Sequence, residues 1–195
     1  RHGRLNAVKV LLAVSTKHYI TEQDRKCRTP LYFAVELGHL GIVQTLLEQS
    51  GHLLEECLVR GCGPSNQPPL HRAIIYGRTR IALAIVNSST PTHFRWSIWN
   101  ARDSFGNTPV HLLAQYGCMP VLEVLVYSFR AERSCLVQRC LLTCKNKAGQ
   151  TPPDLAHQYG RRHVLIYLFR LVKVMQERRK CLLHPNDVPG AGLQT

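Results

Sequence analysis

Cysteine and histidine are the residue types in this chain best suited to bind a metal ion or to act as nucleophiles. The 195-residue sequence contains 8 Cys and 10 His, and a structural zinc site usually presents its thiolates in closely spaced pairs. No Cys-x-x-Cys pair occurs, and the densest cluster, Cys135, Cys140 and Cys144, has no histidine at helical spacing. We therefore predict no metal site. No export signal opens the sequence, so we expect reduced cysteines rather than disulfides.

The sequence carries no other arrangement of residues that is typical of catalysis. It shows no nucleophile beside a base, no paired carboxylates in one segment and no glycine-rich loop for phosphate. The histidines are scattered, and two of them, His71 and His111, occupy equivalent positions in a repeated segment. We predict that the protein is not an enzyme, that it needs no cofactor and that it takes no small-molecule substrate.

The charge of the chain is strongly positive. There are 25 Lys and Arg against 12 Asp and Glu, which gives a formal net charge of +13. Such an excess favours an acidic protein segment, nucleic acid or an anionic membrane as the partner. The longest apolar run near the end, "VLIYLF" at 164–169, is far shorter than the ~20 residues that cross a bilayer. We therefore expect a cytoplasmic protein, with the nucleus as an alternative.

A short segment that recurs along the chain accounts for the positions of these histidines. It reads "DSFGNTPVHLLAQYG" at 103–117, and versions of it stand at 24–38, 63–77 and 146–160. Thr108 and Pro109 suit the start of a helix, where a hydroxyl can cap the first turn and the missing N–H of proline costs nothing. Gly106 suits a left-handed turn, and Gly117 allows the helix to end and reverse. Each copy therefore predicts a turn followed by two helices.

This pattern resembles the ankyrin repeat, which combines a turn, Thr-Pro-Leu-His-x-Ala-Ala, a glycine and a second helix rich in Val and Leu. The resemblance implies an all-α repeat solenoid of stacked helix-turn-helix units over residues 1–170. We predict a partial repeat at 1–20, full repeats at 24–50, 63–88, 103–128 and 146–170, a helical extension at 171–183 and a disordered tail at 184–195.

Several repeats depart from the pattern. Cys27 stands at the position of the turn glycine, where a side chain is disfavoured, so we expect a less regular turn at 25–28. Asn66 stands at the same position in the next repeat. Pro68 replaces the capping threonine there, so we expect that repeat to be the weakest member of the inter-repeat hydrogen-bond ladder.

The helix-ending glycines recur every 35–43 residues, compared with a family period of ~33, so the connections between repeats contain extra residues. These insertions carry apolar residues of their own. Trp96 and Trp99 lie three residues apart in one of these insertions. On a helix they would share a face. Either they insert into a partner or they seal the insertion onto the stack.

Three tyrosines, Tyr76, Tyr116 and Tyr159, immediately precede the glycine that ends the first helix, and Leu37 has the same position. In a regular stack these residues form a column, which could anchor a partner or simply cover the helix ends.

The resemblance implies a noncatalytic module that binds another protein through turn tips, the first-helix surface and the insertions. The candidate contacts are basic, aromatic or polar residues at those places: Arg25, Lys26, Arg28, Tyr76, Trp96, Trp99, Phe105, Asn107, Tyr116, Lys145, Lys147 and Tyr159. The charge favours an acidic segment as the partner. Two alternatives are a cytosolic regulatory domain of a larger membrane protein or channel, and a basic surface for nucleic acid or anionic lipid.

Overall fold

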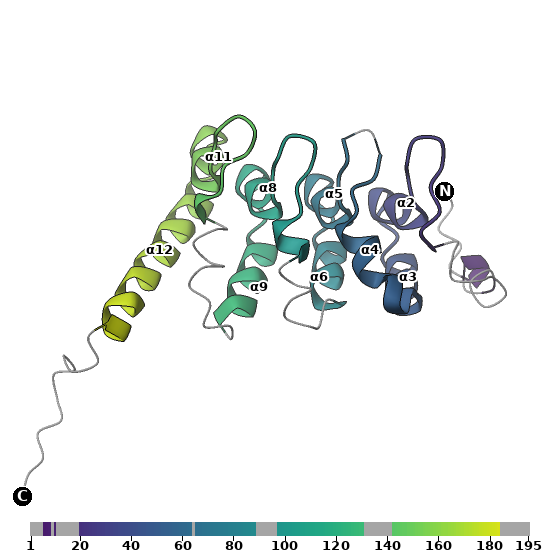
Figure 1. Ribbon diagram of the computed structural model, residues 1–195, viewed down its shortest axis with the longest axis horizontal. Helices are drawn as coiled ribbons and strands as arrows, with labels where there is room; N and C mark the ends of the chain where they lie inside the picture. The colour runs from purple at the N-terminus through teal and green to yellow at the C-terminus, as the bar shows by residue number, and fades with distance from the viewer. Residues whose placement is uncertain are drawn as a thin grey trace, which may run out of the picture.

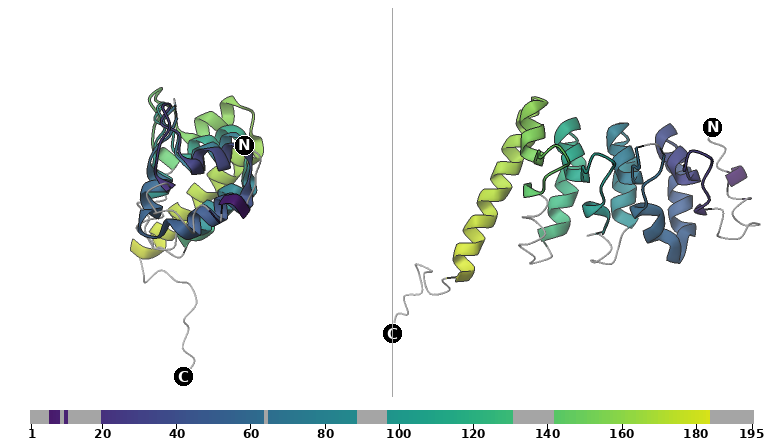
Figure 2. Two further views of the ribbon diagram at one scale, coloured as in Figure 1. Left: turned by 90° about the vertical axis from the view of Figure 1, so that its right-hand side faces the viewer. Right: turned by 45° about the horizontal axis from the view of Figure 1, so that its top comes forward.

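The computed structural model describes residues 6–8, 10, 20–63, 65–88, 97–130 and 142–183. Helices stand in pairs that stack in a single row, and the turn before each pair projects toward the same edge (Figure 1). Viewed along the stack, these turns overlap at that edge (Figure 2). The pairs are α2 (Pro30–Leu37) with α3 (Leu40–Ser50), α5 (Pro69–Ile75) with α6 (Thr79–Ser88), α8 (Pro109–Tyr116) with α9 (Met119–Arg130), and α11 (Pro152–Gln158) with α12 (Arg162–Leu183). This arrangement confirms the predicted all-α repeat solenoid.

The first helix of each pair begins at the repeated proline, as the sequence predicts. At the start of α2, the Thr29 hydroxyl accepts a hydrogen bond from the Tyr32 amide at 3.2 Å. At the start of α11, Thr151 and Asp154 form a reciprocal capping box, in which the Asp154 carboxylate accepts from the Thr151 amide at 2.8 Å. The proline and the cap together fix where α2 and α11 begin.

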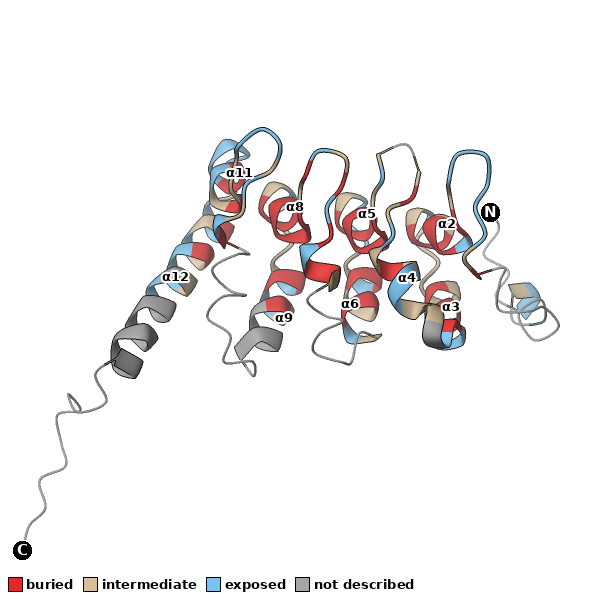
Figure 3. Ribbon diagram, viewed as in Figure 1, coloured by how far each residue is buried: buried red, intermediate tan, exposed pale blue. Residues whose placement is uncertain are grey.

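The core lies between the row of first helices and the row of second helices (Figure 3). Helices α2, α5, α8 and α11 contact one another in sequence, as do α3, α6 and α9. Val35, Ala73, Leu113 and Ala156 from the first helices are almost fully buried. Because each repeat covers its neighbours, the stability of the array is the sum of its units and their interfaces.

The described ends of the insertions belong to this core. Between α3 and α5 the chain forms the 3-10 helix η2 (Gly51–Leu53) and helix α4 (Leu54–Val59), and residues 97–100 form a further helical segment. Leu58, Ile98 and Trp99 are 0–1% exposed. The prediction that Trp99 contacts a partner is therefore wrong, because its ring fills the interior of the stack.

The turn that contains Cys27 is as regular as the others, contrary to expectation. Cys27 adopts a φ of 55°, compared with 75° for Gly106, and its amide donates to the Asp24 carbonyl at 2.9 Å. The left-handed backbone costs about 1–2 kcal/mol for a residue with a Cβ. The Asp24 carboxylate offsets this cost by accepting hydrogen bonds from the Lys26 and Arg28 amides, both at 2.9 Å.

Several predicted regions fall wholly or largely outside the described residues. They are the partial repeat at 1–20, of which residues 6–8, 10 and 20 are described, Trp96, the cysteines Cys135 and Cys140, and the tail at 184–195. The predicted extension at 171–183 continues α12 as one helix.

Candidate protein-interaction surface

The turn tips are joined into a continuous row by backbone hydrogen bonds between neighbouring repeats. The Ser104 amide donates to the Ser65 carbonyl at 3.1 Å, and the Lys147 amide donates to the Phe105 carbonyl at 3.0 Å. In the sequence of the earlier repeat Pro64 aligns with Ser104 and Lys147, and proline has no amide hydrogen to donate. There the donor is Gly63 instead, which bonds the Cys27 carbonyl at 3.0 Å. The tips therefore form one connected edge.

Two buried histidines connect each turn to the next repeat. Nε2 of His71 lies 2.9 Å from the Asn107 carbonyl oxygen, and Nε2 of His111 lies 3.1 Å from that of Gln150. A carbonyl accepts only, so in both rings Nε2 carries the proton and Nδ1 must find a donor. His111 finds it in Thr108, whose hydroxyl lies 2.8 Å from Nδ1 and whose amide lies 3.2 Å away.

His71 has no such donor. Its Nδ1 is buried and makes no hydrogen bond, because Pro68 replaces the capping threonine and lacks both a hydroxyl and an amide hydrogen. Burial lowers the pKa of His71 to about 4 and also lowers the pKa of His111. The hydrogen bond from His71 to the next repeat forms, so the ladder is not broken at this repeat. What the repeat lacks is the threonine cap of its first helix.

Asn107 takes part in the same ladder. Its side-chain amide donates to Asp103 at 3.3 Å, and its side-chain oxygen accepts from Asn146 at 3.0 Å. Its carbonyl oxygen accepts from His71. The polar groups of Asn107 are therefore used within the stack, and we do not include it in the interaction surface.

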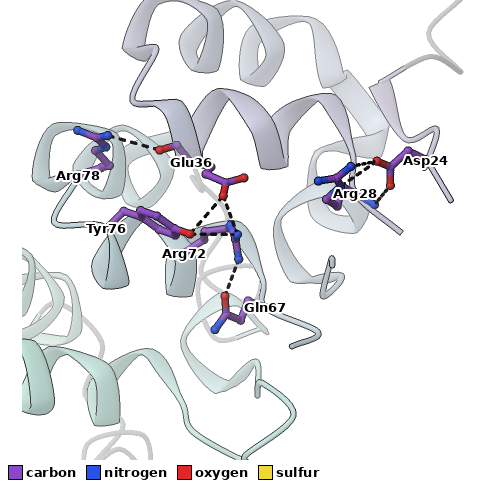
Figure 4. A network of polar contacts seen from close by, with 7 residues as sticks. All are labelled: Asp24, Arg28, Glu36, Gln67, Arg72, Tyr76 and Arg78. Atoms are coloured by element: carbon purple, nitrogen blue, oxygen red, sulfur yellow. Dashed lines mark hydrogen bonds and ion pairs between the residues drawn. The ribbon is translucent and has the colours of Figure 1, made fainter. Parts of the chain in front are cut away.

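A buried arginine connects one turn to the end of a first helix (Figure 4). The Arg72 guanidinium donates to Gln67 of its own turn at 2.8 Å and pairs with Glu36 of the preceding repeat at 3.2 Å. It stacks on the ring of Tyr32 at 3.8 Å and lies 5.1 Å from that of Tyr76. The Tyr76 hydroxyl donates to Glu36 at 3.2 Å. This network holds Tyr76 in place where the turn and the helix end meet.

Sequence reasoning missed this network, although a signal for it exists. The other repeats carry Phe33, Leu112 and Leu155 at the position of Arg72. A single arginine at an apolar position of a repeat needs buried partners, because burying an unpaired charge is costly.

The residues that precede the helix-ending glycines form an exposed column. Leu37, Tyr76, Tyr116 and Tyr159 are 41%, 43%, 41% and 46% exposed. Similar exposure in four repeats shows that the position itself, rather than an accident of one repeat, leaves these side chains open to solvent. We call them the exposed column.

Basic residues stand at the turn tips. Arg25, Lys26, Lys145 and Lys147 are exposed, and no ion pair is formed by any of them among the described residues. Arg28 differs, because it pairs with Asp24 at 2.6 Å and so holds the pKa of that carboxyl at about 2. Its charge is already neutralised. We call Arg25, Lys26, Lys145 and Lys147 the tip cations.

Phe105, also at a turn tip, is 61% exposed. Its carbonyl oxygen accepts the hydrogen bond from the Lys147 amide, so Phe105 and this tip cation belong to adjacent turns that are bonded to each other.

Two further arginines border the exposed column. Arg78 donates to the Glu36 carbonyl at 3.4 Å, and Arg161 donates to the Gln115 carbonyl at 3.0 Å. These carbonyls lie at the C-terminal ends of α2 and α8, where unsatisfied acceptors and the helix dipole favour a cation. Each arginine thus ties its repeat to the preceding one. Cys118 has the equivalent position in the repeat between them.

The part of the chain that the structure describes contains no group of three or more His, Cys, Asp or Glu residues placed to hold a metal ion. The cysteines Cys27, Cys57, Cys62 and Cys118 are free thiols. Burial raises the pKa of Cys57 and Cys62, which disfavours the reactive thiolate. Among the described helices, none combines the length and the hydropathy that a bilayer span requires.

The fold and its ladder of turns define a helical repeat protein. Residues 1–95 match the family model described as ankyrin repeats, with three copies, and the repeats beyond residue 95 share the same turn, proline start and helix pair. The chain belongs to the ankyrin-repeat family. No curated protein matches it. Ankyrin repeats are generally modules of protein–protein interaction and are typically noncatalytic.

Proposed function

We propose that this array is a noncatalytic adaptor that binds an acidic segment of another protein along its turn tips and exposed column. One observation carries the proposal: within the described part of the chain the tip cations form no ion pair, whereas the nearby carboxylates are bonded within their own turns. The Asp103 carboxylate accepts from the Phe105 and Asn107 amides at 2.9 and 2.8 Å. The surface therefore presents positive charge that the array itself does not neutralise.

The tips and the column border one another, which supports a single binding surface. Arg72 bonds both Gln67 of a turn and Tyr76 of the column, the latter at 3.4 Å. At the far end of the array, Gln150 of a turn donates to Gln158 at 2.7 Å, next to Tyr159. Aromatic side chains are common anchors at protein interfaces, and cations around them steer an acidic partner.

The surface runs along the stack, so it suits an extended segment better than a compact one. The proposal places the protein in a reducing compartment, the cytoplasm or the nucleus, where an exposed thiol such as Cys27 stays reduced.

The test is affinity capture with the full chain, followed by titration of the recovered partner against variants. Reversal of tip charges in the quadruple variant Arg25→Glu, Lys26→Glu, Lys145→Glu and Lys147→Glu should weaken binding at least about tenfold, because like charges then face the acidic segment. Binding of the unchanged chain should also weaken with salt, since the Debye length falls from ~10 Å at 0.1 M to ~3 Å at 1 M.

A matched control reverses two exposed cations on second helices, Arg80→Glu and Arg162→Glu, and is compared with Arg25→Glu and Lys26→Glu. The control should leave the affinity for the partner within about twofold of that of the unchanged chain.

The exposed column is tested by Tyr76→Ala and Tyr116→Ala. Equal losses for the control and the tip variant, or no loss from either the tip or the column variants, would contradict the proposed surface.

A further inference from the structure

The last helix of the stack has an exposed face that mixes cations with large apolar side chains. Ile166 and Phe169 on α12 are 53% and 59% exposed. Arg162, Arg170 and Lys173 are exposed on the same side, because positions three and four residues apart lie together on a helix. We call these five residues the α12 outer face.

The orientation of α12 is fixed by its opposite side. Val164 and Leu168 are 0% and 1% exposed, and α12 packs on α11. In Figure 1, α12 is the terminal layer of the stack. Burial of Val164 and Leu168 therefore turns Ile166 and Phe169 toward solvent.

Ile166 differs from two of its three equivalents in the inner repeats. The equivalent positions hold Gln44 and Glu123, which are polar and exposed, and Leu83, which is partly buried. A polar residue at this outward position is thus compatible with stable stacking, so packing within the stack does not require an isoleucine there. Phe169 differs, because the equivalent Leu47 is buried in its repeat.

A further repeat stacked on α12 does not explain this face. It could bury Phe169, but Ile166 lies at a position that stays exposed or half-buried inside the array. It would also have to cover Arg162, which replaces the partly buried Leu40 and Met119 of inner repeats. Burial of an unpaired arginine is costly.

The charge of the face also argues against a second copy of this chain. The sequence has no Asp or Glu between residues 161 and 176, and Arg162, Arg170 and Lys173 form no ion pair within the described residues. Two copies that met through this face would bring cations together. The face needs an anionic partner.

The shape of the face distinguishes between anionic partners. One side of a single helix is convex, whereas a bound peptide usually lies in a groove lined by several elements. A planar surface can contact all five residues at once over the ~17 Å between Arg162 and Lys173. Helices that rest on membranes combine cations with Phe or Ile in this way, since the apolar side chains enter the headgroup boundary and the cations stay among the phosphates.

We propose that the α12 outer face binds the surface of a membrane rich in anionic phospholipid. The array would lie at the membrane through its last helix, and the turn tips and exposed column would remain free for a protein partner. This inference does not depend on the proposed protein partner, because it uses different residues.

The experiment is cosedimentation of the full chain with vesicles of phosphatidylcholine, with and without phosphatidylserine, at 0.1 M salt. Each cation near an anionic surface strengthens binding about fivefold, so three cations should give roughly 100-fold tighter binding to the anionic vesicles. Neutralisation by Arg162→Gln, Arg170→Gln and Lys173→Gln should remove most of this difference. Replacement of the apolar pair by Ile166→Gln and Phe169→Gln should weaken binding at least about tenfold.

A matched control removes the same net charge elsewhere, through Arg25→Gln, Lys26→Gln and Lys147→Gln, and should change binding less than about fivefold. All of these residues are exposed, and circular dichroism checks that each variant keeps its helices. The proposal is overturned if the chain does not bind the anionic vesicles or if the control loses as much binding as the α12 variant. It is also overturned if the apolar pair has no effect, or if only duplex DNA or a poly-glutamate peptide binds this face.

Discussion

A missing helix cap in the middle of the array offers a direct test of how the repeats are stabilised. Pro68 precedes α5 at the position that threonine occupies before α2, α8 and α11. Its backbone angles, φ −58° and ψ 154°, lie close to those of Thr108, φ −86° and ψ 166°. Threonine can therefore replace Pro68 without backbone strain, and Pro68→Thr is the perturbation.

The expected gain is set by the buried Nδ1 of His71, which makes no hydrogen bond. A new threonine supplies the two donors that Thr108 offers to His111 at 2.8 and 3.2 Å. Satisfying a buried polar atom contributes about 1–3 kcal/mol, and a helix cap about 1 kcal/mol. Loss of the proline also raises the conformational entropy of the unfolded chain, which lowers the free energy of unfolding by about 0.4–1 kcal/mol. The first two gains come from the same threonine and overlap, so we expect a net stabilisation of about 1–2 kcal/mol.

Urea denaturation and thermal melting measure the change. For a chain of this size the gain corresponds to a rise in Tm of about 2–8 °C. Pro68→Val is the matched control, since valine has the shape of threonine and an amide hydrogen but no hydroxyl. We expect Pro68→Thr to exceed it by about 1 kcal/mol. Equal stability of the two variants, or a Pro68→Thr variant no more stable than the original, would refute the role assigned to the hydroxyl.

Three other predictions concern stability. Burial lowers the pKa of His71 to about 4, whereas a histidine in the unfolded state titrates near 6.5, so the unfolded state binds the proton first as the pH falls. Urea titrations should therefore show the free energy of unfolding decreasing by up to about 3 kcal/mol from pH 6.5 to 4. The decrease should be smaller in His71→Asn. Trp99→Ala should cost about 3–5 kcal/mol in the same assay and Phe105→Ala under ~0.5, because only Trp99 is buried. Gly117→Ala should lower the Tm more than Gly160→Ala, since both have positive φ but only at Gly117 would a Cβ meet a neighbour, the Arg161 side chain at 3.2 Å.

The sequence by itself determined the repeating unit. Proline after threonine starts a helix through local geometry, and Gly106 and Gly117 take backbone angles that other residues rarely adopt. These effects involve a few adjacent residues, so their spacing predicts the helices and turns wherever it recurs. The same logic predicted the exposed column as a repeated position, although the sequence left open whether its side chains cover helix ends or face a partner.

Tertiary structure decided what the side chains do between repeats. Tryptophan is a residue type that often anchors interfaces, yet Trp99 is fully buried. The neighbouring helices that cover it come from elsewhere in the chain. Arg72 stands at an apolar position and is stable there only because Glu36, from the preceding repeat, lies within 3.2 Å. Burial and charge pairing depend on which residues meet in space, and a local pattern carries no information about those meetings.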